Sequence, residues 1–255
     1  MATTDGNVVQ HDKSLIGEGI IRLRKYGSQG PLIDIGNSDA FNLSFSVEKR
    51  TLKNFRGGGG NRNVKEIISD VTAALGLYDL TAENIARALK GSTVAIAADP
   101  IVDELLVCGG LINEFVPFAN IPDTSIAVTV TDAATVPGTL VAGTDYVLNP
   151  HGLTILSNKI TSAGLKVSYT PKAGSAIHLL AGSGQEWEIH IAGLNDAQSG
   201  APYSVRIHRA KFGLSSEFAL LSQDYTKLSP PLEILADDTV IGDGISKFVR
   251  MDIVD

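Results

Sequence analysis

Two alternating segments joined by a glycine-rich connector constrain the fold of this 255-residue chain more than any other feature. From Ala40 to Lys49, apolar residues alternate with polar ones, and Val64 to Leu75 repeats the period of two. Successive side chains of a β-strand point to opposite faces, so each segment is predicted to be a strand with one apolar and one polar face. The connector Asn54–Arg62 contains four consecutive glycines and predicts a hairpin with a long, mobile tip.

Strand signals continue through most of the chain, separated by turn residues. One helix is predicted after residue 81, because Thr81 can cap its start, Lys90 lies in its last turn and Gly91 follows as the C′ residue. The pattern predicts a mainly antiparallel β architecture with one surface helix. The predicted strands outside the hairpin are residues 15–26, 32–36, 126–131, 145–148, 153–156, 165–170, 186–193, 203–210, 218–221, 232–235 and 248–253.

Two further segments stand apart in this pattern. The interval 121–172 has little charge and is predicted to be a small β insertion. The first residues, 1–13, are predicted to form a loose, flexible N-terminal arm.

The charge balance excludes several classes of protein. The formal net charge is −7 and the pI is near 5.2, whereas tight binding to DNA or to an anionic membrane requires a surplus of Lys and Arg. The single cysteine, Cys108, excludes an intrachain disulfide and fits a reducing compartment. Met1–Gln10 has no apolar signal core and no stretch is long enough to span a membrane, so we expect a soluble protein made in the cytoplasm.

The basic residues gather in the first half of the chain without the interleaved aromatic residues typical of nucleic-acid binding. A solvated face, or ion pairs to acidic patches on an identical neighbour, explains them more simply. They are Arg22, Arg24, Lys25, Lys49, Arg50, Lys53, Arg56 and Arg62.

The glycine run does not match a nucleotide-binding loop. A phosphate-binding loop needs a Lys and a Ser or Thr after its last glycine, at the start of a helix. Asn61 and Arg62 follow instead, and then a predicted strand. A flexible loop, or one ordered by a partner, is the better interpretation.

Glu186 and Glu188 flank Trp187 and are the one arrangement that resembles a catalytic pair. Carboxylates two apart on a strand share a face at about 7 Å, which is loosely similar to the acid and base of a glycosidase. Alternation alone produces the same pattern, so a polar strand face backed by a buried Trp187 is favoured.

The histidines and the cysteine give no site pattern. The histidines form neither HxH nor HExxH, no metal-ligand cluster accompanies them, and Cys108 is interpreted as a small core residue. We therefore expect a protein that is not an enzyme and that needs no cofactor or metal. The five histidines are His11, His151, His178, His190 and His208.

The order of these elements resembles the tail tube protein, or major tail protein, of long non-contractile-tailed bacteriophages. The resemblance covers most of the chain. It is carried by the hairpin with its glycine-rich loop, the helix segment 80–89, Gly143–Tyr146 and Val167–Thr170 in the insertion, and the later segments His190–Asn195, Tyr203–Ala210 and Leu232–Asp237. The run of four glycines and the extent of the insertion depart from the family pattern.

The resemblance implies a tail-tube fold, an antiparallel β-sandwich or barrel bearing a long loop on a hairpin. It also implies six subunits per ring and rings stacked into a hollow tube through which phage DNA passes into the host without specific binding. The hairpin strands of neighbours would join in a closed barrel, with Phe41, Leu43, Phe45, Val47, Ile67 and Val71 on the buried face. The residues expected to line the lumen are Asn42, Ser44, Ser46, Glu48, Glu66, Asp70 and Thr72.

The resemblance further implies that the loop at 54–63 reaches the adjacent ring. The expected inter-ring residues are Asn54, Phe55, Arg56, Gly57, Gly58, Gly59, Gly60, Asn61 and Arg62. The implied partners are other copies of the chain, a tape measure protein and tail terminator or tip proteins, but no membrane. The implied location is the virion, after synthesis in the host cytoplasm.

Three other functions remain open from the residues alone. A carbohydrate-binding or carbohydrate-cleaving β protein would place an exposed Trp187 beside Glu186 and Glu188. A bacterial surface adhesion module would use the insertion as an Ig-like domain. A sheath, spike or capsid component would also self-assemble.

Overall fold

The computed structural model describes residues 13–134, 138–182 and 184–254. The fold is mainly β, with antiparallel sheets, as the alternating pattern predicts. The described residues contain one α-helix, α1 (Ala82–Ala88), and a single short 3-10 helix, η1 (Asp196–Gln198). The chain divides into two compact units, residues 1–92 with 177–255, and residues 93–176. The predicted arm 1–13 lies outside the described residues except for Lys13.

The first unit is built on one eight-stranded sheet. The strands follow the order β2-β1-β13-β14-β15-β4-β3, and β16 also pairs with β14. Among the described residues, β3 is the edge strand at one end of the sheet. At the other end β2 pairs with β1 only at Arg22 and Leu23, so most of the outer edge of β1 has no partner strand. The strands are β1 (Gly17–Lys25), β2 (Ile33–Asp34), β3 (Ser38–Lys53), β4 (Asn61–Leu77), β13 (Glu186–Asn195), β14 (Ala201–Phe212), β15 (Pro231–Ile234) and β16 (Val249–Ile253).

The core of this unit covers one face of the sheet. Buried aliphatic side chains of β1, β4, β13, β14 and β15 meet there, and α1 contributes Ala88, with Leu89 following it. The alternation of β4 supplies the buried Val71, Ala73 and Leu75. Half-buried Phe41 and Leu43 of β3 pack against the same core.

The helix begins as predicted and ends differently. The side-chain oxygen of Thr81 accepts the N–H of Asn84, so Thr81 is the N-cap. At the other end Lys90, not Gly91, takes the left-handed conformation, with φ of 48°. The N–H of Gly91 donates to the carbonyl of Ala86, which makes Gly91 the C″ residue of a Schellman motif. A Cβ on Gly91 would lie 2.7 Å from the carbonyl oxygen of His178, so close packing requires glycine there.

The second unit contains two three-stranded antiparallel sheets, with the orders β7-β10-β9 and β6-β11-β8. Its own core includes Leu153, Ile155, Leu165, Val167 and Cys108. Burial raises the pKa of the Cys108 thiol above its ordinary value. The strands are β6 (Ile101–Leu106), β7 (Phe115–Pro117), β8 (Thr129–Asp132), β9 (Tyr146–Asn149), β10 (Gly152–Ile155) and β11 (Leu165–Tyr169).

The unit starts earlier than the predicted insertion at 121–172, and β6 and β7 precede that interval. Where the chain passes between the units, β5 (Ser92–Ile96) and β12 (Gly174–His178) pair in a two-stranded sheet. The sequences of β5, β6, β7 and β12 show no clear alternation of apolar and polar residues. The strand predicted at 218–221 is wrong, because those residues form bends and irregular loop.

Candidate assembly interface

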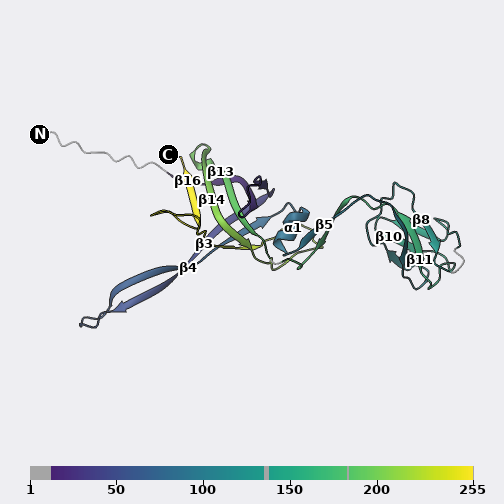
Figure 1. The fold of residues 1–255 in the computed structure, drawn as a ribbon, viewed down its shortest axis with the longest axis horizontal. Coiled ribbons are helices and arrows are strands. Elements are labelled where there is room, and N and C mark those ends of the chain that lie inside the picture. Colours follow the sequence, from purple (N-terminus) through teal and green to yellow (C-terminus); the bar gives the residue numbers. More distant parts are fainter. Residues whose placement is uncertain (1–12, 135–137, 183, 255) are drawn as a thin grey trace. The chain divides into compact units, whose positions relative to one another are not determined.

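The β3–β4 hairpin extends well beyond the sheet to which it belongs. β4 pairs with β15 only from Thr72 to Ala74, whereas its antiparallel pairing with β3 continues to Asn61 opposite Lys53. Among the described residues, the two strands pair only with each other beyond Thr72, and Figure 1 shows them projecting from the unit. We call residues 45–70, including the tip, the distal ribbon.

A β-bulge divides the hairpin into two halves. Ser46 lies opposite Asp70, but the next residue, Val47, lies opposite Ile68, so Ser69 is the extra residue on β4. Residues directly opposite each other in an antiparallel pair project from the same face. The bulge therefore moves Ile68 onto the face that carries Val47.

This register corrects part of the predicted face assignment. Glu66 lies opposite Lys49 and forms an ion pair with it at 3.3 Å between Nζ and Oε1, while Ile67 lies opposite Glu48. Glu66 therefore projects from the apolar face and Ile67 from the polar face, the reverse of the prediction. The physical reason is the bulge at Ser69, which a strict period of two cannot reveal.

The other six residues predicted to line a lumen share one face. Asn42, Ser44 and Ser46 alternate along β3, and their opposite positions include Thr72 and Asp70. Glu48 follows on the same side of β3. All are exposed except the half-buried Thr72. The hairpin thus has a polar face at these six positions. Nearer the tip the same face carries Ile67 and then Arg50 opposite Lys65.

The opposite face carries an uncovered apolar stripe, which consists of Phe45, Val47 and Ile68. Their exposed fractions are 65%, 56% and 57%. Phe41, Leu43 and Val71 on the same face pack against the unit's own core, but that core ends before the stripe begins. Three large apolar side chains side by side on a two-stranded ribbon are typical of a surface that another molecule covers.

The ribbon tip has a defined backbone shape. The N–H of Asn54 donates to the carbonyl of Gly60, and its side-chain amide donates to the carbonyl of Gly57. All four residues Gly57–Gly60 have positive φ, between 68° and 92°. Such a run is accessible only to glycine without strain. Phe55 is 86% exposed beside it.

A groove lies between β1 and β3, the two strands with uncovered edges. It holds about 260 Å³, and its walls include Ile21 of β1, Phe41 and Leu43 of β3, and Met251 of β16. We call it the edge groove. Its full lining is Leu15, Gly17, Gly19, Ile21, Ser38, Asp39, Ala40, Phe41, Leu43, Ile191, Tyr203, Val205 and Met251.

Two local features shape one end of this groove. The ring of Tyr203 lies over Gly193 and Gly17, where a Cβ would approach its atoms to 2.2 and 2.4 Å. Asn195 accepts the N–H of Ile16 and donates to the carbonyl of Ser14, which fixes the segment that enters β1. Asn195 lies two residues beyond the predicted strand 186–193, at the end of the segment His190–Asn195 that carries the resemblance, and its role cannot be deduced from spacing.

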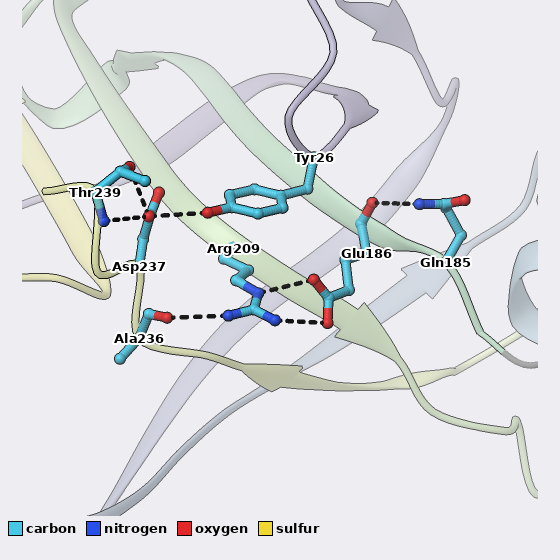
Figure 2. A network of polar contacts seen from close by, with 7 residues as sticks. All are labelled: Tyr26, Gln185, Glu186, Arg209, Ala236, Asp237 and Thr239. Atoms are coloured by element: carbon cyan, nitrogen blue, oxygen red, sulfur yellow. Dashed lines mark hydrogen bonds and ion pairs between the residues drawn. The ribbon is translucent and has the colours of Figure 1, made fainter.

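The suspected carboxylate pair on β13 is held in ion pairs. Figure 2 shows both oxygens of Glu186 accepting from Arg209, at 2.8 and 2.9 Å. The Arg209 guanidinium holds the pKa of Glu186 below its ordinary value. Glu188 pairs with Arg24 at 2.7 Å. Both carboxylates therefore link neighbouring strands of the sheet.

The same network fixes the turn after β15. Asp237 accepts from the Tyr26 hydroxyl at 2.9 Å and from the N–H and hydroxyl of Thr239, while Arg209 donates to the carbonyl of Ala236 (Figure 2). The Arg209 guanidinium also lies 5.3 Å from the centre of the Tyr26 ring. This network connects β1, β13, β14 and the closing turn.

Trp187 lies on the core side of the sheet. It is half-buried, packs against the hydrophobic core, and has the Arg87 guanidinium 4.8 Å from its ring centre. Glu186 and Glu188 alternate with it on the opposite face. The three residues that would form a sugar site are therefore separated by the strand, as the alternative of a polar face backed by a buried Trp187 predicts.

Comparison with known proteins identifies a family without assigning it an activity. Residues 14–252 match the model of the family described as "Protein of unknown function UCP028589". The chain belongs to this family. No curated protein matches the sequence. Among the described residues, no helix is long and apolar enough to cross a membrane.

Proposed function

We propose that the chain is the major tail tube subunit of a long non-contractile-tailed bacteriophage. In this proposal, six copies form a ring and rings stack into a hollow tube, with the polar face of the hairpin toward the lumen. The tape measure protein and then DNA occupy the lumen, and terminator and tip proteins close the ends.

The distal ribbon is the observation that carries this proposal. An isolated two-stranded ribbon is marginally stable in water, and this one leaves a row of large apolar side chains uncovered. Its outer strand β3 also leaves backbone groups available to a neighbouring sheet. A chain that exposes both features supports assembly with other copies, because closing a barrel between copies satisfies both.

The polar face supports the choice of a conduit for DNA. Its hydroxyl, amide and carboxylate groups are Asn42, Ser44, Ser46, Glu48, Asp70 and Thr72. None of these six side chains is basic, so this part of the face offers no cation to displace counterions from phosphates. The basic residues of the same face, Arg50 and Lys65, lie opposite each other nearer the tip, and Arg50 pairs with Glu48 at 3.3 Å. DNA would slide past such a lining without being held.

Electron microscopy of the purified full-length chain tests the proposal. We expect hollow filaments of stacked six-membered rings at high protein concentration. Particles that stay monomeric, or assemblies without a channel, would contradict it. A sheath or capsid component would instead give wider lattices or shells.

Deleting Gly57–Gly60 tests the predicted role of the tip. We expect a folded chain that forms single rings but no stacked tubes, because the tip no longer reaches the next ring. The matched control is Leu221→Ser, a substitution at a residue that is 97% exposed and lies far from the hairpin in sequence. Normal tubes from the deletion variant would refute the inter-ring role.

A further inference from the structure

We propose that the apolar stripe of one chain docks in the edge groove of a second copy of the same chain. This inference rests on the proposed function, since it names the two surfaces through which the copies meet. The stripe is Phe45, Val47 and Ile68, and the groove lies between β1 and β3.

The two surfaces match in chemistry. The stripe offers an aromatic ring and two branched aliphatic side chains, all more than half exposed. The groove is lined by aliphatic and aromatic side chains together with Ser38 and Asp39, and its apolar lining residues Leu15 and Met251 have exposed fractions of 51% and 43%. Burying these groups against each other removes apolar surface from water on both sides.

The geometry of β3 requires that the stripe and the groove come from different copies. Phe41 and Leu43 line the groove of their own chain, and Phe45 and Val47 follow them on the same face of the same strand. The strand runs out of the groove toward the tip, and its pairing with β4 continues along that length. The stripe therefore leads away from its own groove, and the groove it fills must belong to another copy.

Charge favours this pairing over one in which two stripes stack face to face. Residues 45–70 hold six Lys or Arg and three Asp or Glu, a net charge of +3. Because the whole chain carries −7, the residues outside the ribbon carry a net charge of −10. Two stacked ribbons would bring +3 against +3, whereas a ribbon docked elsewhere on a neighbour meets a part of the chain whose net charge is negative. Glu18 lies on β1 beside the groove. Asp39, which lines it, pairs with Lys227 at 2.6 Å, and Asp252 of β16 pairs with Arg250 at 2.8 Å.

A contact between two different surfaces repeats from copy to copy. It closes into a ring when the rotation between copies allows, and otherwise continues as a filament. Docking the stripe in the groove therefore supplies a ring contact that is distinct from the tip contact between rings.

Disulfide trapping between two single variants tests the inference. The Val47→Cys and Met251→Cys variants are mixed under assembling conditions and oxidised. Mass spectrometry then maps the disulfides, and electron microscopy of the same samples shows whether tubes form. We expect a disulfide between positions 47 and 251 in the mixture and in neither variant alone. The matched control replaces Val47→Cys by Leu221→Cys, and the wild-type chain controls for the buried Cys108.

The outcomes separate this inference from the proposed function. Tubes without a disulfide between positions 47 and 251 overturn the inference while the tube subunit stands. Dimers of the Val47→Cys variant alone that are joined by a disulfide at position 47 would also overturn the inference, because they place two stripes against each other, and they leave the proposed tube subunit standing. An absence of any assembly by the wild-type chain overturns both proposals.

A second measurement identifies the occupant of the groove directly. A photoreactive phenylalanine at position 251, in a mixture of ¹⁴N- and ¹⁵N-labelled chains, should cross-link to residues 45–50 or 66–70 of a differently labelled copy. Cross-links to residues 1–12, or to the ribbon of the same copy, would overturn the inference. Phe45→Ser with Ile68→Ser should weaken assembly at least tenfold and leave the monomer folded, and unchanged assembly would count against it.

Discussion

At the scale of single residues, polar side chains fix segments that the apolar pattern leaves undefined. Asn84 is buried, and its amide donates to the carbonyls of Ile35 and Asp79, which ties α1 to the chain around β2. Asp145 has no exposed surface and accepts from the N–H of Val141, the hydroxyl of Ser157 and the ammonium of Lys159. Neither role was predicted, because a polar residue inside a turn or helix gives no periodic signal.

Replacing Asp145 by Asn should destabilise the second unit. The backbone and side-chain donors hold the pKa of Asp145 below its ordinary value of about 3.9. A carboxylate with a lowered folded pKa stabilises the fold above the unfolded pKa, and that contribution is lost as pH falls through the folded pKa.

We therefore expect Asp145→Asn to lower the melting temperature by several degrees at pH 7 and by progressively less below about pH 4. Thermal unfolding followed at several pH values measures this. Asp99→Asn, at an exposed position, is the matched control. An effect that is independent of pH would mean that the charge of Asp145 does not stabilise the unit.

At the scale of elements, the sequence located most strands and missed how they are bent. The hairpin strands, the helix start and the strong strands β13 and β14 follow from alternation and capping residues. The bulge at Ser69 does not, because an inserted residue changes the faces without changing the composition. The exposed Ile68 thereby takes the place predicted for Ile67, and the apolar stripe could not be found from the pattern.

The close approach of Tyr203 to Gly193 gives a prediction at this scale. A methyl group at Gly193 would overlap the Tyr203 ring, so Gly193→Ala should cost about 1–3 kcal/mol of unfolding free energy by overpacking. Urea unfolding measures the loss. Gly174→Ala, where the nearest atom to a Cβ is 4.0 Å away, should change stability by much less. Equal effects at the two positions would contradict the packing explanation.

At the scale of the whole molecule, two separate cores explain why the boundary of the insertion was misplaced. Low charge marked 121–172, but the second unit begins at residue 93, and β6 and β7 belong to it. Its first strands look irregular in sequence because β6 pairs only with β11 and leaves Val102 and Leu105 exposed. Exposure of apolar residues on an edge strand removes the alternation on which the prediction depended.

Calorimetry of the full chain should resolve two transitions, since each unit has its own hydrophobic core. Asp145→Asn should lower one of them and Gly193→Ala the other, because the two residues belong to different units. A single transition that both substitutions shift equally would show that the units unfold together.

The run of residues with left-handed backbone conformation at the tip limits which amino-acid substitutions the hairpin tolerates. Each of Gly57–Gly60 would be strained by about 1–2 kcal/mol if it acquired a side chain. Without side chains, these four residues can offer a neighbour only amide hydrogens and carbonyl oxygens. In the proposed assembly, a neighbour would contact this surface through its main chain, so the contacting residues could change identity as long as their shape persists.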